Sequence, residues 1–327
     1  QVLLTDPHPH FDSHLLQRLD DKIIFHLWKH LRDKILQLIH AHFQRHIFPP
    51  SQLLTRVAAN RQEDKMAILE RCDTNAVAHL TLNMGDKLNP LSEEMLDALQ
   101  HQCDLLAEDH SIRAVILSGA GKAFCAGHDL KQMTAARQAE DGGQAYFKAL
   151  FDQCTGVMLS LRNLPQPVIA QVHGIAAAAG CQLVASCDMA GAAQGARFGV
   201  NGVNIGLFCS TPMVALSRNI ARKQAFEMLT TGQFISAEKA EALGLVNRVV
   251  PQDRLAEATQ DLAELVASKL GAVVKIGKQA FYQQIDMPID AAYGHAGDVM
   301  VQNMLYRDTE EGIAAFLDKR PPDWQQD

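Results

Sequence analysis

Hydrophobic and polar positions alternate with a period of two in short segments, and longer segments between them have a helical period. Residues 76–82 alternate as a strand does, and residues 113–118 and 167–172 are short apolar runs that lead into glycine-containing turns. Ser92 precedes a helical pattern and is predicted to cap it. A further helix is expected at 143–162. Because strands that alternate with helices pair in parallel, the pattern predicts an α/β fold.

The two ends of the chain differ from this middle part. Apolar residues recur every three to four positions between Leu15 and Phe43, as in a long amphipathic helix. From about residue 211 the pattern is nearly all helical, with one short strand at 245–250. We therefore expect an N-terminal extension at 1–65, a core at 66–260 and a helical region at 261–327. The extension is either an oligomer or partner helix or an accessory segment upstream of a natural start at Met66.

Composition narrows the class of protein. The 327 residues carry a formal charge of −7 without a long basic run, which argues against nucleic acid or an anionic membrane surface as the main partner. No apolar stretch reaches about 18 residues, so no integral membrane segment is expected. Acidic residues in the first 35 positions are atypical of a mitochondrial presequence, so we expect a cytoplasmic protein, with the mitochondrial matrix as the alternative. Seven cysteines without a C-x-x-C spacing indicate reduced thiols and no metal site.

Two segments rich in small residues carry the candidate chemistry. They are KAFCAGHDL at 122–130 and HGIAAAAGCQLVASCD at 173–188, and each places small residues after a predicted strand, where a helix begins. The first N–H groups of a helix have no partner inside it, and small side chains let a ligand approach them. Two such donors directed at one point would form an oxyanion hole. Tight packing of helix on sheet is the alternative explanation of the alanines.

Further motifs extend this pattern. They are DKLNPLS at 86–92, FGVNGVNIGLFCSTP at 198–212, ISAEKAEALGLVNRVVP at 235–251 and EGIAAFLDKR at 311–320. With the two small-residue segments, they make residues 66–324 resemble the enoyl-CoA hydratase/isomerase (crotonase) superfamily, and within it a subgroup of hydratase domain-containing proteins. The resemblance implies a ClpP/crotonase-like spiral of ββα units with a helical C-terminal trimerisation region, hence a homotrimer or hexamer. It also implies an acyl-CoA thioester as ligand, with CoA entering as part of the substrate and no separate cofactor.

The resemblance assigns roles to particular residues. The family's two backbone oxyanion donors fall on Ala126 and Ala179, and the two catalytic glutamates of its hydratases fall on Gln182 and Gly202. Glutamine has no titratable proton and glycine has no side chain, so we expect ordinary hydration and isomerisation to be largely lost.

Other residues are candidates for acid–base chemistry or for binding. His128, Asp129 and Cys209 are candidates for the missing acid or base, and Asn201 and Asn204 for orienting water. The residues implied to contact the CoA thioester are Lys87, Leu88, Ala126, His128, Asp129, Leu130 and Lys319. For Lys319, a solvated helix end is the alternative.

Three functions stay open at this point. The first is a lyase- or isomerase-class enzyme of fatty-acid metabolism that acts on an acyl-CoA through a stabilised enolate. The second is an acyl-CoA-binding or regulatory protein without catalysis, and the third is a structural partner in a mixed oligomer. The two small-residue segments favour the first two.

Overall fold

The computed structural model describes residues 68–325, all within one compact unit that spans residues 60–327. The extension predicted at 1–65, with its amphipathic helix, lies outside the described residues. The larger sheet has the strand order β1-β2-β3-β5-β7-β10, in which only β1 is antiparallel to its neighbour. Its strands are β1 (Leu69–Thr74), β2 (Val77–Leu82), β3 (Ala114–Gly119), β5 (Val168–Val172), β7 (Met189–Ala193) and β10 (Arg248–Val250).

The smaller sheet has the order β4-β6-β8-β9, with β4, β6 and β8 parallel and β9 antiparallel to β8. Its strands are β4 (Ala123–Cys125), β6 (Ile175–Ala177), β8 (Arg197–Gly199) and β9 (Ile235–Ser236). Consecutive strands alternate between the two sheets, β3 then β4, β5 then β6, and β7 then β8, and a helical segment follows each pair. This repeated ββα unit confirms the predicted spiral.

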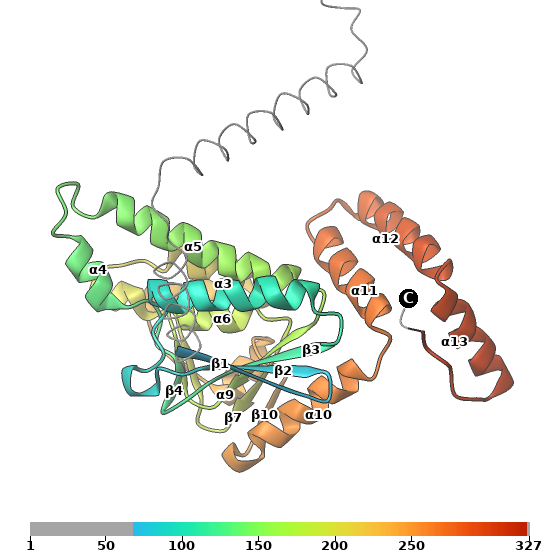
Figure 1. Cartoon of the computed structure of the whole chain (residues 1–327). Coiled ribbons are helices and arrows are strands. Elements are labelled where there is room, and N and C mark those ends of the chain that lie inside the picture. The colour runs from blue at the N-terminus through green and yellow to red at the C-terminus, as the bar shows by residue number, and fades with distance from the viewer. Residues whose placement is uncertain (1–67, 326–327) are drawn as a thin grey trace, which may run out of the picture. The chain divides into compact units, whose positions relative to one another are not determined.

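Helices cover both faces of the larger sheet (Figure 1). Val115 and Leu117 of β3 join the main core with α3 (Glu93–Glu108), α5 (Gln144–Asn163) and α6 (Ala179–Ser186), whereas Ile116 packs with Ala263 of α10 (Leu255–Ala267) on the opposite face. Alternate side chains of a strand point to opposite faces, so a sheet covered on both sides needs continuous apolar runs. The predicted cap is confirmed, because the Oγ atom of Ser92 accepts a hydrogen bond from the Met95 backbone N–H at 3.3 Å.

The remaining helical elements follow the sheet or connect its strands. They are η2 (Gly85–Lys87), α4 (Leu130–Ala136), η3 (Asn201–Ile205), α7 (Ser210–Asn219), α8 (Arg222–Thr231), α9 (Ala237–Leu243), η4 (Gln252–Arg254), α11 (Gly271–Gln284), α12 (Ile289–Met304) and α13 (Arg307–Asp318). The boundary expected between residues 260 and 261 falls inside α10, which packs on the sheet, so the C-terminal helical region begins with α11. No helix within residues 68–325 has the length and apolar character needed to cross a membrane.

Candidate functional site

The two small-residue segments lie against each other. Strand β4 runs parallel to β6, so the turn after each strand emerges at the same edge of the smaller sheet. Gly180, the second residue of α6, lies so close to the preceding segment that a Cβ atom there would be 2.1 Å from the Cys125 carbonyl oxygen. Gly127 has a φ of +96°, and a Cβ atom there would be 3.1 Å from the Ala177 carbonyl oxygen. The short contact at 180 and the positive φ at 127 favour glycine, and they explain why small residues stand in both motifs.

A pocket of about 600 Å³, here called the first pocket, opens beside this contact. Its wall is built from η2, the segment around Ala126, the start of α6, η3 and the start of α7. It brings together most of the predicted site residues: Lys87, Ala126, His128, Asp129, Leu130, Ala179, Asn201, Gly202 and Cys209. Leu88, Gln182, Asn204 and Lys319 are not among the described residues that line it. Lys319 lies at the C-terminal end of α13.

The two predicted oxyanion donors differ in their availability. Ala179 is the first residue of α6, so no earlier turn of that helix supplies a carbonyl for its N–H. Ala178 before it has the unusual backbone angles φ 49° and ψ −116°, a strained conformation that sets the direction in which the helix starts. The N–H of Ala126 instead donates to the Leu88 carbonyl oxygen at 3.0 Å. Of the two predicted oxyanion donors, the Ala126 N–H is therefore already paired, whereas the Ala179 N–H has no backbone acceptor within residues 68–325.

Asn89 holds the loop that accepts this hydrogen bond, a role that the sequence analysis missed. Its side chain is fully buried, and its Nδ2 lies 2.8 Å from both the Ala120 and the Ala123 carbonyl oxygens. Its Oδ1 accepts from the Met84 N–H at 2.8 Å. Asn89 itself has φ 52°, a left-handed conformation that asparagine tolerates better than most residues. The Asn-Pro pair inside DKLNPLS is the sequence signal that could have indicated this turn.

His128 is a largely enclosed imidazole in the wall of the first pocket. Its Nδ1 lies 3.3 Å from the Leu91 carbonyl oxygen, and its ring meets the Phe151 ring edge to face at a centroid distance of 5.6 Å. Its Nε2 is buried and has no hydrogen-bond partner among the described residues. Burial lowers the pKa of His128, and the hydrogen bond with Leu91 opposes that change. The imidazole is therefore neutral at pH 7.

Asp129 and Cys209 each lie at the start of a helix, Asp129 at α4 and Cys209 at α7. The Oδ1 of Asp129 accepts hydrogen bonds from the Lys131 N–H at 2.8 Å and from the Gln132 N–H at 3.3 Å, which makes it the N-cap of α4. Cys209 precedes α7 and is buried, and burial raises the pKa of its thiol. Asp129 thus has a structural task, and Cys209 is a thiol, not a thiolate, at neutral pH.

Gly202 is closed off by its own loop. A Cβ atom there would lie 2.3 Å from the Leu207 carbonyl oxygen and 2.9 Å from the Cys209 sulfur. Because a backbone atom makes the closer contact, rotating a side chain cannot relieve it. A glutamate therefore cannot be placed at 202 without rearranging the segment 202–209.

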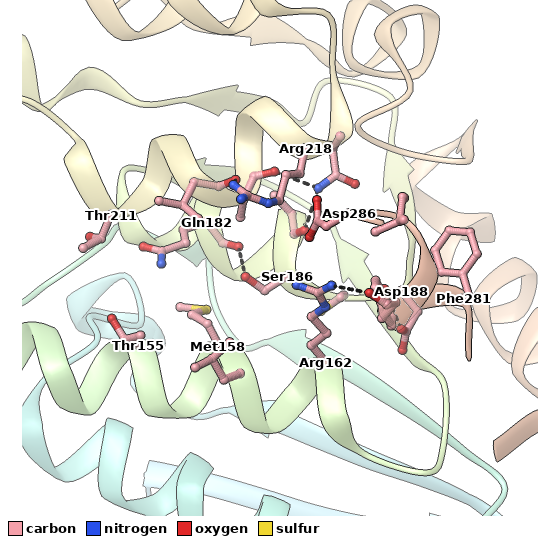
Figure 2. A pocket seen from close by; sticks show the side chains of 18 residues that line it. Thr155, Met158, Arg162, Gln182, Ser186, Asp188, Thr211, Arg218, Phe281 and Asp286 are labelled. Carbon is pink, nitrogen blue, oxygen red and sulfur yellow. Dashed lines mark hydrogen bonds between the residues drawn. The ribbon is translucent and has the colours of Figure 1, made fainter. Parts of the chain in front are cut away.

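Gln182 faces a second pocket of about 540 Å³, which lies between α5, α6, α7 and α11 (Figure 2). Figure 2 shows Thr155, Met158 and Arg162 pointing into it from α5, opposite Gln182 and Ser186 of α6. The side chain of Gln182 is 5% exposed, and its Oε1 has no hydrogen-bond partner among the described residues. Thr211 lines both pockets, and Gln182 follows Ala179 by three residues, which places both on one side of α6. The helix α6 therefore contributes residues to the walls of both pockets.

An ion pair anchors α11 beside the second pocket. Lys278 donates from Nζ to Asp188 Oδ2 at 2.7 Å, and the hydroxyl of Tyr282 donates to Asp188 Oδ1 at 2.8 Å. The Val168 N–H at the start of β5 donates to the same carboxylate at 2.6 Å. The guanidinium of Arg162 lies 4.5 Å from the centre of the Tyr282 ring. Residues 90 positions apart meet here, and no motif in the sequence indicated it.

Metal and disulfide chemistry find no support in the part of the chain that the structure describes. Residues 68–325 contain no cluster of three or more His, Cys, Asp or Glu side chains that could hold a metal ion. All seven cysteines are free, and burial raises the pKa of Cys125 and Cys181 to about 12.

Comparisons with known proteins agree with this architecture. The family model described as enoyl-CoA hydratase/isomerase matches residues 73–327. The human protein named enoyl-CoA hydratase domain-containing protein 3, mitochondrial, is 42% identical over 280 residues, which cover 85% of this chain and 91% of the relative.

Solved structures give the same result. An enoyl-CoA hydratase from Mycobacterium smegmatis is 53% identical with a TM-score of 0.75, and the match covers 79% of this chain and 98% of that one. The crystal structure of human enoyl-CoA hydratase domain-containing protein 3 is 43% identical with a TM-score of 0.75, over 79% of this chain and 100% of that one. The matches confirm the resemblance, including its subgroup, and the chain belongs to the enoyl-CoA hydratase/isomerase family.

Proposed function

We propose that this protein binds acyl-CoA thioesters in the first pocket, stabilises their enolate through the Ala179 N–H, and hydrates enoyl-CoA poorly. One observation carries the proposal. The pocket wall holds an unpaired backbone donor at the start of α6, but no glutamate is among the described residues that line it. A donor of this kind stabilises negative charge on a thioester oxygen. Hydration also needs groups that activate water and protonate carbon, each contributing about 10²–10⁴-fold.

The two pockets suit the two ends of such a ligand. Lys87 and Lys131 line the first pocket, and their ammonium groups can meet the phosphates of CoA. The second pocket has apolar side chains from α5, α7 and α11, including Met158, Val214 and Phe281. An acyl chain whose carbonyl lies at Ala179 would continue along α6 past Gln182 into this space. The arrangement therefore favours acyl chains longer than four carbons.

Calorimetric titration with octanoyl-CoA, butyryl-CoA and free CoA tests the binding. We expect octanoyl-CoA to bind most tightly and free CoA most weakly. Ala179→Pro removes the donor but also restricts the backbone of Ala178, so circular dichroism establishes that the variant is folded, and Ala179→Ser is the control that keeps the N–H. Weaker thioester binding in the proline variant alone would support the proposal. Equal binding of octanoyl-CoA and free CoA by the wild type would refute it.

Hydration is tested separately with crotonyl-CoA and a longer trans-2-enoyl-CoA. We expect turnover many orders of magnitude below that of a two-glutamate hydratase, because Gln182 and Gly202 supply no carboxylate. Turnover equal to that of such a hydratase would overturn this part of the proposal.

A non-catalytic acyl-CoA-binding or regulatory role is the second candidate. It is favoured by the neutral amide of Gln182 and by the closed loop at Gly202, which leave no carboxylate at the positions assigned to the family's glutamates. Binding without any turnover or exchange of the ligand's α-protons would select this role. A lyase- or isomerase-type role in fatty-acid metabolism would show at least one of these activities.

Location and assembly complete the proposal. The human, rat and mouse relatives carry the word mitochondrial in their names, which favours the mitochondrial matrix over the cytoplasm for this protein as well. Large apolar side chains on α12 and α13, among them Ile289, Tyr293 and Phe316, are more than 70% exposed and suit association between copies. We propose a homotrimer or a dimer of trimers, which analytical ultracentrifugation would distinguish from a monomer.

A further inference from the structure

The first pocket contains one group that is suited to remove a proton at neutral pH. A carbonyl oxygen can only accept a hydrogen bond, so the contact between His128 Nδ1 and the Leu91 carbonyl places the ring proton on Nδ1. The lone pair is then on Nε2, which is buried and lacks a partner within residues 68–325. A buried acceptor without a donor is energetically unfavourable, and its lone pair remains available to take a proton from a bound ligand.

The other titratable groups of the pocket are less suited to this task. They are Asp86, Lys87, Asp129, Lys131 and Cys209. Asp129 accepts two backbone hydrogen bonds as the cap of α4, and the raised pKa of Cys209 keeps its thiol protonated. A lysine ammonium group has donors only and no lone pair. Asp86 lies in η2, and within residues 68–325 no hydrogen bond or ion pair holds its carboxylate against the segment of Ala126 or against α6.

Packing fixes the position of the imidazole. The ring of His128 meets Phe151 of α5 on one side, and residues Leu91 and His128 form an isolated parallel bridge. The ring is two residues beyond Ala126 and lines the same pocket as Ala179. Catalytic hydrogen bonds often form only in the complex with the ligand, so the enclosed Nε2 of the unliganded site is compatible with a role in proton transfer.

We propose that His128 is the general base that removes an α-proton from the bound acyl thioester, an inference that rests on the thioester binding proposed above. The lone pair of Nε2 takes the proton, and the C–H bond breaks. Its electron pair forms a carbon–carbon double bond, and the thioester oxygen becomes the oxyanion held by Ala179. The imidazolium then exchanges its Nε2 proton with water, and return of a solvent proton (a deuteron in D₂O) to the α-carbon restores the ligand, so water is the only other reactant.

Exchange of α-protons for deuterium in D₂O, followed by NMR with octanoyl-CoA, measures this step without requiring a product. His128→Asn keeps a donor for the Leu91 carbonyl but lacks Nε2, and His128→Phe keeps the ring packing on Phe151 but lacks both nitrogens. We expect exchange to fall about 10²–10⁴-fold in both variants. Calorimetric affinity for octanoyl-CoA should change less than threefold. His173, which contacts the Gly121 carbonyl and does not line the pocket, gives the matched control His173→Asn with unchanged exchange.

The pH dependence gives a second readout. The base acts as neutral imidazole, and burial lowers the pKa of His128, so wild-type exchange should fall as the solution is acidified through this lowered pKa and should level off at higher pH. Exchange that is unchanged in either folded variant, or wild-type binding without exchange, would overturn the proposal for His128. Failure of the wild type to bind octanoyl-CoA would instead refute the proposed function. Circular dichroism and the unfolding midpoint establish that each variant is folded.

Discussion

Gly180→Ala tests whether the contact between the two small-residue segments sets the position of the oxyanion donor. A Cβ atom at 180 would lie 2.1 Å from the Cys125 carbonyl oxygen, 2.8 Å from its carbonyl carbon and 2.9 Å from its Cβ. Real Cβ contacts are not shorter than 3.0 Å, so the start of α6 and residue 125 must separate by about 0.9 Å. The two nearest atoms belong to the backbone, so a side-chain rotation cannot absorb the shift.

The expected effect is larger on function than on stability. Overpacking costs about 1–3 kcal/mol, and the better helix propensity of alanine offsets about 1 kcal/mol of it. The free energy of unfolding should therefore fall by about 0–2 kcal/mol. A displacement of about 1 Å at a reacting centre can lower a rate by about 10²-fold, so α-proton exchange should fall by about that factor. The donor at Ala179 is one residue from the substitution and moves with it.

The assay combines urea denaturation with α-proton exchange of octanoyl-CoA in D₂O. Gly156→Ala in α5 is the matched control, because a Cβ atom there would have its nearest neighbour at 3.8 Å, an ordinary contact. It should stabilise the protein by about 0.5–1 kcal/mol and leave exchange unchanged. Exchange at the wild-type rate in Gly180→Ala would show that the packing of the segments does not position the donor.

Three further predictions concern stability. Asp188→Asn breaks the ion pair with Lys278, in which the side chain of Asp188 is 12% exposed and that of Lys278 is 6% exposed. Urea denaturation should show a free energy of unfolding lower by about 3–5 kcal/mol, and a loss below about 1 kcal/mol would contradict this. Ala178→Gly removes the backbone strain at φ 49° but adds flexibility to the unfolded chain, so we expect a net gain of about 1 kcal/mol in the free energy of unfolding and a higher unfolding midpoint. A lowered midpoint would argue against strain there. Arg320 lowers the pKa of Glu311 from 4.5 to about 2, so the pair stabilises the fold above pH 4.5 and loses this effect as the pH falls to about 2. Thermal midpoints of wild type and Glu311→Gln should accordingly differ above pH 4.5 and converge near pH 2; a difference independent of pH would refute this.

The sequence predicted the elements whose patterns are long or strongly apolar. Strands β2, β3 and β5 and the cap at Ser92 lie where the periodicity placed them. Strands β4, β6 and β8 have three residues each, too few for a period of two to stand out. For this reason the sequence predicts that residues 175–177 belong to the start of the alanine-rich helix. This prediction is wrong, because they pair with β4 and β8 and form β6.

The site shows a similar division. The convergence of Ala126, His128 and Ala179 on one pocket followed from motifs that end parallel strands. The hydrogen bond from Ala126 to Leu88 and the closure of the loop over Gly202 depend on backbone positions that no side-chain pattern records. The pairing of Asp188 with Lys278 arises from packing between elements 90 positions apart, for which charge alone gives many possible partners.

The closed loop at Gly202 has a consequence for how such a protein can change over evolutionary time. Any small residue supplies the N–H at 179, so thioester recognition tolerates exchange among small side chains at that buried position. A carboxylate at 202 cannot be introduced as easily, because the Leu207 carbonyl and the Cys209 sulfur fill the space that a side chain there would need. A single substitution of Gly202 by glutamate would therefore produce a steric clash. Other substitutions in the segment 202–209 would have to open the loop first. The closed loop therefore restricts the protein to chemistry that the groups now present in the first pocket can perform.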